Sequence, residues 1–264
     1  MLRAACCVLL VLLSACATGG SGRSTCRSFR VMTWNIAAGH GNLGRTADII
    51  RSMNPDVVAL QEVDVRWSER SAFVDQADSL ARSLHMNVRF APIYDFSPRQ
   101  FGVAVLSRFP IVSWTNHEIT RLSTQQANAT PAKAPGFLET VIDLRGTSVR
   151  VFSTHLDYRS DPSVREKQVS EMMAVIGQSA MPTILAGDLN ATSSAPELKP
   201  LMASFQDMAA AADGGDMTYP SEAPTKRIDY VLASSGFTVS ETRVAATDAS
   251  DHRPVMLTMT PCRK

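Results

Sequence analysis

A largely apolar segment that ends abruptly in polar side chains constrains the fold of this chain more than any other feature. Residues 181–186 suit a buried strand, and Gly187, Asp188, Leu189 and Asn190 follow directly. Side chains at i and i+2 of a strand share a face, so Asp188 and Asn190 are predicted to project together. Buried charges need a partner or a metal, so this pair indicates a carboxylate that orients water or metal and an amide that holds an oxyanion. The alternative is a turn, because Gly-Asp-x-Asn is also common turn chemistry.

Short apolar strands and amphipathic helices fill the rest of the chain. Branched and aromatic content predicts further strands at residues 29–36, 56–60, 88–92, 102–106, 111–117, 138–144, 149–156, 228–232, 237–244 and 255–259. Helical spacing and capping signals predict helices at residues 46–53, 71–84, 162–176 and 197–204. The polar segment 121–136 is expected to be a loop on one rim. Because strands outnumber helices and many lie close in sequence, we predict a mixed, largely antiparallel α+β sandwich.

Several predicted strands end in, or contain, a polar residue that could carry chemistry. These residues are Asn35, Glu62, His155, Asp188 with Asn190, Asp229, and Asp251 with His252. Each has a structural alternative, such as a turn, a solvated strand end or a hydrogen-bonded core histidine. Asp229 is harder to explain in that way, since a carboxylate inside Ile-x-Tyr-Val-Leu must find a partner or shift its pKa. His252 beside Asp251, with Asp229 upstream, indicates a histidine that a carboxylate orients as a base.

The first sixteen residues have the features of an export signal. Arg3 supplies positive charge, residues 8–13 form a short apolar core, and small residues precede Cys16. That core is shorter than the roughly 20 apolar residues that span a bilayer as a helix. Leu13-Ser14-Ala15-Cys16 resembles the lipobox of bacterial lipoproteins, which implies cleavage before Cys16 and acylation of its thiol. The alternative is a plain secretory peptide cut at a nearby small residue.

This interpretation divides the chain into three parts. Residues 1–15 are the lipoprotein signal peptide, residues 16–25 are a Gly/Ser-rich tether from acylated Cys16, and residues 26–264 are one folded domain. The mature protein is expected outside the cytoplasm, anchored to a membrane of the bacterial envelope, on the periplasmic side or at the outer-membrane face.

Cysteine usage fits an oxidising compartment. Cys6 and Cys7 leave with the signal and Cys16 is acylated, so Cys26 and Cys262 remain at the two ends of the domain. An even pair in such a compartment predicts a disulfide between them. Two free terminal thiols are the alternative.

Composition limits the function only weakly. Hydrophobic residues make up 45% of the chain and charged residues 19%, as in an ordinary globular domain. The formal net charge of +1 gives no strong electrostatic footprint for nucleic acid, although it does not exclude a nuclease.

Seven short motifs, in a fixed order, resemble the endonuclease/exonuclease/phosphatase superfamily of DNase I-like phosphoesterases over residues 29–260. They are Met32-Thr33-Trp34-Asn35-Ile36, Leu60-Gln61-Glu62, Phe101-Gly102-Val103-Ala104-Val105-Leu106-Ser107, Ser153-Thr154-His155-Leu156-Asp157, Ala186-Gly187-Asp188-Leu189-Asn190, Arg227-Ile228-Asp229-Tyr230 and Ser250-Asp251-His252-Arg253-Pro254. The resemblance implies a four-layered α/β sandwich of two packed mixed β-sheets flanked by helices. It also implies neighbouring first and last strands, which would bring Cys26 and Cys262 close together.

The resemblance also implies roles for the polar residues. Glu62 would ligate a divalent cation, Mg²⁺ with Mn²⁺ or Ca²⁺ as alternatives, while Asn35 would contact metal or phosphate and Asp251 could add a carboxylate. His252, oriented by Asp229, would act as general base or polarise the phosphate. The remaining side chains have distinct expected tasks: Asp188 orients the attacking water, Asn190 donates to a phosphate oxygen, His155 acts as acid or oxyanion stabiliser, and Glu139 orients His155.

The implied activity is metal-dependent hydrolysis of a phosphoric ester, most simply a phosphodiester, by in-line water attack on phosphorus. The substrate stays open among nucleic acids, phospholipid head groups and small phosphoesters, and we expect a monomer held at the membrane by its lipid anchor. The alternative is a non-catalytic lipoprotein that keeps this fold as a binding module.

Overall fold

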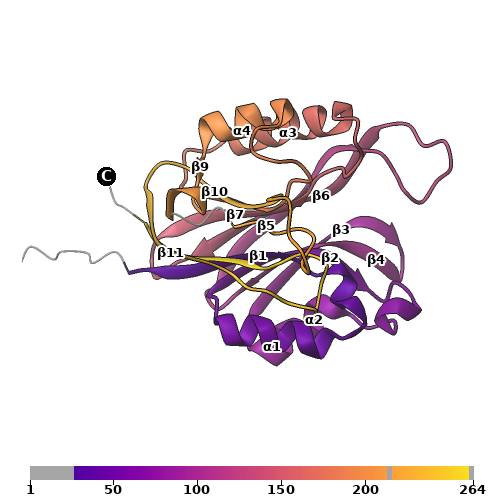
Figure 1. Ribbon diagram of the computed structural model, residues 1–264, viewed down its shortest axis with the longest axis horizontal. Coiled ribbons are helices and arrows are strands. Elements are labelled where there is room, and N and C mark those ends of the chain that lie inside the picture. Colours follow the sequence, from indigo (N-terminus) through magenta and orange to yellow (C-terminus); the bar gives the residue numbers. More distant parts are fainter. Residues whose placement is uncertain (1–26, 213–215, 262–264) are drawn as a thin grey trace, which may run out of the picture.

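The computed structural model describes residues 27–212 and 216–261, and its core is a pair of six-stranded sheets packed face to face (Figure 1). The first sheet has the order β11-β12-β1-β2-β4-β3 and is built from β1 (Phe29–Asn35), β2 (Val57–Val65), β3 (Asn87–Phe96), β4 (Arg99–Ser107), β11 (Phe237–Val244) and β12 (Val255–Pro261). The second has the order β5-β6-β7-β8-β10-β9 and is built from β5 (Ile111–Arg121), β6 (Ala132–Asp143), β7 (Ser148–His155), β8 (Thr183–Asp188), β9 (Gln206–Asp207) and β10 (Asp229–Ala233).

Helices cover the outer face of each sheet and complete four layers (Figure 1). They are α1 (Leu43–Met53) and α2 (Gln76–Leu84) on the first sheet and α3 (Ser163–Ile176) and α4 (Lys199–Ser204) on the second. Short 3-10 turns occupy Ala37–Gly41, Glu69–Ser71, Pro196–Leu198 and Ala210–Ala212. Both sheets are mixed, because β1 pairs with β2, and β7 with β8, in parallel among otherwise antiparallel pairs. The predicted α+β four-layered sandwich is confirmed.

Strand alternation separates three apolar cores. In β1, Phe29 and Val31 point between the sheets, whereas Met32 and Trp34 point toward α1 and α2. In the second sheet, Val151 points between the sheets and residues such as Phe152 pack under α3. Because both faces of the central strands are buried, these strands are nearly continuous apolar runs.

Several predicted boundaries differ from those of the structure, and two of the differences have a clear physical cause. The helix expected over residues 71–84 begins only at Gln76, since Ala72 and Phe73 have φ of 49° and 54° and the Asp75 side chain caps the helix by accepting from the Asp78 N–H. The rim loop expected over residues 121–136 is shorter, because β5 continues to Arg121 and β6 starts at Ala132. Pairing between these two long strands overrides the polar composition of their ends.

The predicted signal peptide, the tether, acylated Cys16 and the Cys26–Cys262 bridge lie outside the described residues. Within the described ranges, no helix combines the length and apolar character that a bilayer crossing requires. The two ends of the described chain meet at one end of the sandwich, where β1 and β12 pair Phe29 with Met259 (Figure 1).

Gly187 sets how closely β7 and β8 approach. A Cβ atom at this position would lie 2.1 Å from the carbonyl oxygen of Thr154, its partner in the parallel register. We predict that Gly187→Ala lowers the free energy of unfolding by about 3 kcal/mol, because the strand backbone must shift. Urea denaturation measures this loss.

Gly44→Ala in α1 is the matched control for that variant. Its added Cβ would meet only the Asn42 side-chain oxygen, at 3.3 Å, and alanine is the better helix former. An equal loss in both variants, or none in Gly187→Ala, would contradict this account of the β7–β8 approach.

Candidate active site

At one end of the sandwich, the side chains that point between the sheets change from apolar to polar. Each inward-facing row begins with residues of the central core and ends in one polar group: Asn35 on β1, Gln61 on β2, His155 on β7, Asp188 on β8 and Asp229 on β10. The parallel register makes His155 the partner of Asp188, and the antiparallel register makes Asp229 the partner of Asp188. Sheet geometry alone therefore gathers these groups.

Asp188 and Asp229 face each other across neighbouring strands and are both fully buried. His252 lies against both, with Nδ1 3.0 Å from Asp229 Oδ2 and Nε2 3.6 Å from Asp188 Oδ2. Burial disfavours the charged imidazolium, but the carboxylates of Asp229, Asp188 and Asp251 outweigh it and raise the pKa of His252 to about 9. The raised pKa favours the charged imidazolium, which suits His252 as a hydrogen-bond donor to phosphate.

Asp188 is the centre of the polar cluster. Burial first, and then the charge of Asp229, raise the pKa of Asp188 to about 6. Its Oδ2 atom accepts a hydrogen bond from Asn35 Nδ2 at 3.1 Å and lies 3.6 Å from His155 Nε2. Burial lowers the pKa of His155 more than the Asp188 carboxylate raises it, so the two histidines beside this carboxylate oxygen have pKa values moved in opposite directions.

A β-bulge directs Glu62 into the site. The register of β2 against β4 shifts between Leu60 and Val63, and Glu62 has a φ of 54°. Glu62 Oε1 accepts from Asn35 Nδ2 at 3.1 Å. Burial and the charge of Asp251 raise the pKa of Glu62, although the hydrogen bond from Asn35 opposes them.

The donor set of Glu62 and Asp251 fits a divalent cation. Two carboxylates repel each other there, Asp251 is exposed, and among the described residues its side chain accepts a 3.4 Å hydrogen bond from Ser250. Mg²⁺ is commonly held by one or two carboxylates together with water and substrate phosphate. The Asn35 Oδ1 atom accepts from the Ala37 N–H while its amide nitrogen holds Glu62 and Asp188, and its predicted contact with metal or phosphate stays a prediction.

Asp188, Asp229 and His252 also bring ligand atoms within 4.8 Å of one another. This trio is already compensated, since charged His252 offsets the carboxylates and Asp188 also accepts from Asn35 and the Asn190 N–H. Glu62 has one such hydrogen bond, from Asn35, and the charge of Asp251 opposes its ionisation, so Glu62 and Asp251 form the alternative candidate cation site.

Asn190 lies beside Asp188 for a different reason from the predicted one. β8 ends at Asp188, and Asn190 follows in a left-handed turn with a φ of 51°, so strand alternation does not align the pair. Instead, the Asn190 N–H donates to Asp188 Oδ1 at 2.8 Å, and Asn190 Nδ2 donates to the Leu156 carbonyl at 3.0 Å. One amide N–H of the two on Nδ2 is left for a ligand.

The prediction that Glu139 orients His155 is wrong. Glu139 is the partner of Phe152 in the β6–β7 register and shares its face under α3, whereas His155 points between the sheets. Glu139 instead binds Arg150 Nε at 2.6 Å and His117 Nε2 at 2.7 Å. This second cluster is structural, since Arg150 also donates to the Ile176 carbonyl at the end of α3.

Sequence reasoning missed several groups that position the site. Gln61 joins the two sheets through Thr33 and Ser153, and Tyr219 packs its ring 4.7 Å from that of His252. Arg121, which was expected in the rim loop, is half-buried and donates to the His155 carbonyl at 3.1 Å; desolvation lowers its pKa to about 10. The sequence could have indicated Gln61, because it directly precedes Glu62, whereas nothing in the sequence indicated Tyr219.

The chain belongs to the endonuclease/exonuclease/phosphatase family, whose model matches residues 32–252. Proteins of this family are phosphoesterase hydrolases and typically depend on a divalent metal. The sandwich and its polar end thus define a protein of the phosphoesterase class, as the motifs predicted.

Individual relatives are distant. The chain is 23% identical to the uncharacterized protein YbhP of Escherichia coli over 251 residues, which cover 86% of this chain and 94% of that one. It is 28% identical to protein cwh43 of Schizosaccharomyces pombe over 164 residues, so the match covers 60% of this chain but only 16% of that protein. An endonuclease/exonuclease/phosphatase structure from Beutenbergia cavernae superimposes with a TM-score of 0.70 at 24% identity, covering 89% of this chain and 72% of the other.

The structural role of Glu139 can be tested through pH. Burial opposes its ionisation, but the hydrogen bonds from Arg150 and His117 outweigh burial and lower the pKa of Glu139. We predict that Glu139→Gln costs about 2 kcal/mol of stability at pH 7, since it leaves Arg150 buried without its carboxylate while partial exposure moderates the loss.

The pH dependence has a defined sign. Because the folded protein keeps Glu139 ionised to lower pH than the unfolded chain does, its stabilisation is complete above the usual glutamate pKa and disappears as pH falls through the lowered value. Urea denaturation of both proteins between pH 7 and pH 3 should show the two stabilities converging. A constant difference across that range would rule out the ion pair as its cause.

Proposed function

We propose that this protein is a divalent-metal-dependent phosphodiesterase that hydrolyses its substrate by in-line attack of water on phosphorus. The observation that carries the proposal is the convergence of two histidines on one buried carboxylate. Nε2 of His155 and Nε2 of His252 each lie 3.6 Å from Asp188 Oδ2. A phosphate group between the two rings would meet donors on both sides, next to a carboxylate that can hold water.

Each residue then has a task that follows from its contacts. Asp188 accepts a proton of the attacking water, and Asn35 keeps its carboxylate in place from 3.1 Å. His252, held through Nδ1 by Asp229, donates from Nε2 to a phosphate oxygen. His155 stands on the other side of Asp188, where it stabilises the developing charge, and Asn190 offers its remaining amide N–H.

A divalent cation at Glu62 and Asp251, with Mg²⁺ the best match to an oxygen donor set, would offset the charge on the phosphate oxygens. The chain would supply the carboxylates of Glu62 and Asp251, and the hydrogen bond from Asn35 holds the Glu62 side chain in place. Asp229 binds no substrate in this scheme and acts through His252 as a positioning residue.

We predict that the purified protein hydrolyses bis-p-nitrophenyl phosphate with Mg²⁺ and loses this activity in EDTA. His252→Ala should lower kcat at least about a hundredfold, because it removes a charged donor to the phosphate. The measurement is the release of p-nitrophenolate at saturating substrate, with p-nitrophenyl phosphate in parallel to separate diesterase from monoesterase activity.

His85→Asn is the control, since His85 is an exposed histidine at the end of α2 whose left-handed conformation asparagine tolerates. It should retain full activity. The proposal fails if Mg²⁺, Mn²⁺ and Ca²⁺ all give no hydrolysis, or if His252→Ala is as active as the unaltered protein.

We further propose an exported lipoprotein with acylated Cys16 and a Cys26–Cys262 disulfide. The lipobox-like Leu13-Ser14-Ala15-Cys16 supports the anchor. The β1–β12 register supports the bridge, because it pairs Phe29 with Met259, and Cys26 precedes Phe29 by three residues just as Cys262 follows Met259 by three. Such an anchor would hold the site at an envelope membrane, with phospholipid head groups or nucleic acid among the esters within reach.

Mass spectrometry of the native protein tests both modifications. We expect an N-terminal peptide that starts at acylated Cys16, and iodoacetamide labelling of Cys26 and Cys262 only after reduction. The bridge would stabilise the domain by about 2–4 kcal/mol. Alkylation of both thiols without reductant would contradict the bridge, and an unmodified Cys16 would contradict the anchor.

A further inference from the structure

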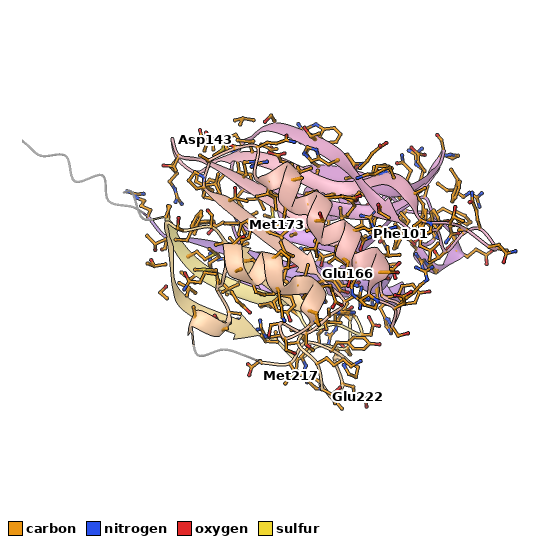
Figure 2. The ribbon with its side chains drawn as sticks, turned by 90° about the horizontal axis from the view of Figure 1, so that it is seen from above. Phe101, Asp143, Glu166, Met173, Met217 and Glu222 are labelled. Atoms are coloured by element: carbon orange, nitrogen blue, oxygen red, sulfur yellow. The ribbon has the colours of Figure 1, made fainter. Side chains whose placement is uncertain are left out.

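Four aromatic rings gather where β3 and β4 turn beside the candidate active site. The aromatic cluster comprises Trp67, Tyr94, Phe96 and Phe101, and the Trp67 ring centroid lies 5.8–6.3 Å from the other three. Tyr94 and Phe101 are direct partners in the β3–β4 register, with stacked rings 6.1 Å apart. The cluster is therefore a product of strand pairing. Figure 2 shows Phe101 far from Asp143, toward the end of the molecule remote from the chain termini.

This cluster is not part of a closed core. Phe96 is 45% exposed, and Trp67, Tyr94 and Phe101 are only half-buried. The Tyr94 hydroxyl accepts a hydrogen bond from the Thr124 N–H at 3.0 Å and shares a second one, of 3.1 Å, with the Thr124 hydroxyl. These bonds fix the ring before any ligand arrives. A rigid, partly exposed aromatic surface of this kind is suited to binding.

The cluster forms one wall of a cavity that opens onto the catalytic groups. This cavity measures about 180 Å³, and Tyr94 and Phe101 line it together with Glu62, His155 and Tyr158. Sites that enclose a whole drug-sized ligand measure roughly 300–1,000 Å³. The cavity therefore has room for one ring system of a substrate whose phosphate lies at the histidines.

The charged side chains around the cavity bear on which substrate group the cavity can hold. The Arg70 guanidinium lies 5.6 Å from the Phe101 centroid and is held there by Asp64 at 2.7 Å. Arg159, on the cavity wall, lies 5.1 Å from the Tyr158 centroid and pairs with Asp157. Guanidinium groups already lie beside these rings, whereas the quaternary ammonium of a lipid head group binds best to aromatic faces that no other cation approaches. A neutral planar ring attached to an anionic phosphate has no such conflict.

We propose that this cavity is a base-binding subsite, in which the nucleobase of a phosphoester substrate stacks on Tyr94 and Phe101. The inference rests on the proposed phosphodiesterase function and names its substrate class. The chain is near neutral, with a formal net charge of +1, so it has no overall excess of positive charge for gripping a long polyanion. The substrate is therefore a nucleotide ester or the end of a nucleic acid strand, bound through one base and one phosphate.

Two esters that differ only in the base test the proposal. They are the p-nitrophenyl ester of adenosine 5′-phosphate and that of methyl riboside 5-phosphate, which share leaving group, sugar and phosphate. We expect kcat/KM to be about tenfold higher for the adenosine ester, the size of one base–aromatic stacking contact. Phe101→Leu, which keeps apolar packing but removes the ring, should reduce that ratio to near one.

Trp114→Leu is the matched control, because Trp114 is an exposed aromatic on β5 that does not line the cavity. It should leave both rate constants and their ratio unchanged, and thermal melts should confirm that both variants fold. A ratio near one in the unaltered protein, or a ratio that survives Phe101→Leu, overturns the subsite while leaving the phosphodiesterase intact.

If neither ester is hydrolysed, the proposed function fails instead. Calorimetry then decides the subsite separately, by comparing the binding of adenosine 5′-phosphate and ribose 5-phosphate in Mg²⁺. Tighter binding of the nucleotide that Phe101→Leu removes supports the subsite, and equal binding of the two overturns it.

Discussion

Two buried carboxylates that face each other across β8 and β10 are the constraint on which the rest of the site depends. Asp188 and Asp229 are direct partners in the sheet, and the solvent reaches neither. Like charges opposite each other destabilise a strand pair, so this arrangement requires a cation or a proton. His252 supplies the positive charge between them, within 3.0 Å of Asp229 and 3.6 Å of Asp188.

That requirement explains why the segment before β12 is held so firmly against β1. Trp34 Nε1 donates to the His252 carbonyl at 2.9 Å, and Ser250 Oγ donates to the Asn35 carbonyl at 2.7 Å. These bonds join residues more than two hundred positions apart and fix His252 over the carboxylates. The same segment carries exposed Asp251, whose charge raises the pKa of Glu62.

The sequence predicted elements and residue types well because strand alternation and apolar content are local properties. It identified Asp188, His155 and Asp229 from their positions at or within apolar strands, and their common face follows from the register. It failed for Glu139, because a shift of one residue along a strand moves a side chain to the other face of the sheet, and the register of β6 against β7 cannot be predicted from the sequence. Asn190 was paired with Asp188 correctly but for the wrong reason, because only the structure shows where β8 ends. The aromatic cluster was also beyond reach, since three of its rings come together through the β3–β4 hairpin and Trp67 joins them from the segment after β2.

The direct test of this account is to monitor the protonation of His252 in the metal-free protein by ¹⁵N NMR of its imidazole as the pH is raised. Charge compensation of Asp188 and Asp229 predicts an imidazolium that is protonated at both nitrogens through neutral pH and titrates near pH 9. Asp229→Asn should move that titration toward the usual histidine value of about 6.5. A neutral imidazole at pH 7, or a titration that Asp229→Asn leaves unchanged, would contradict the central role of this charge pair.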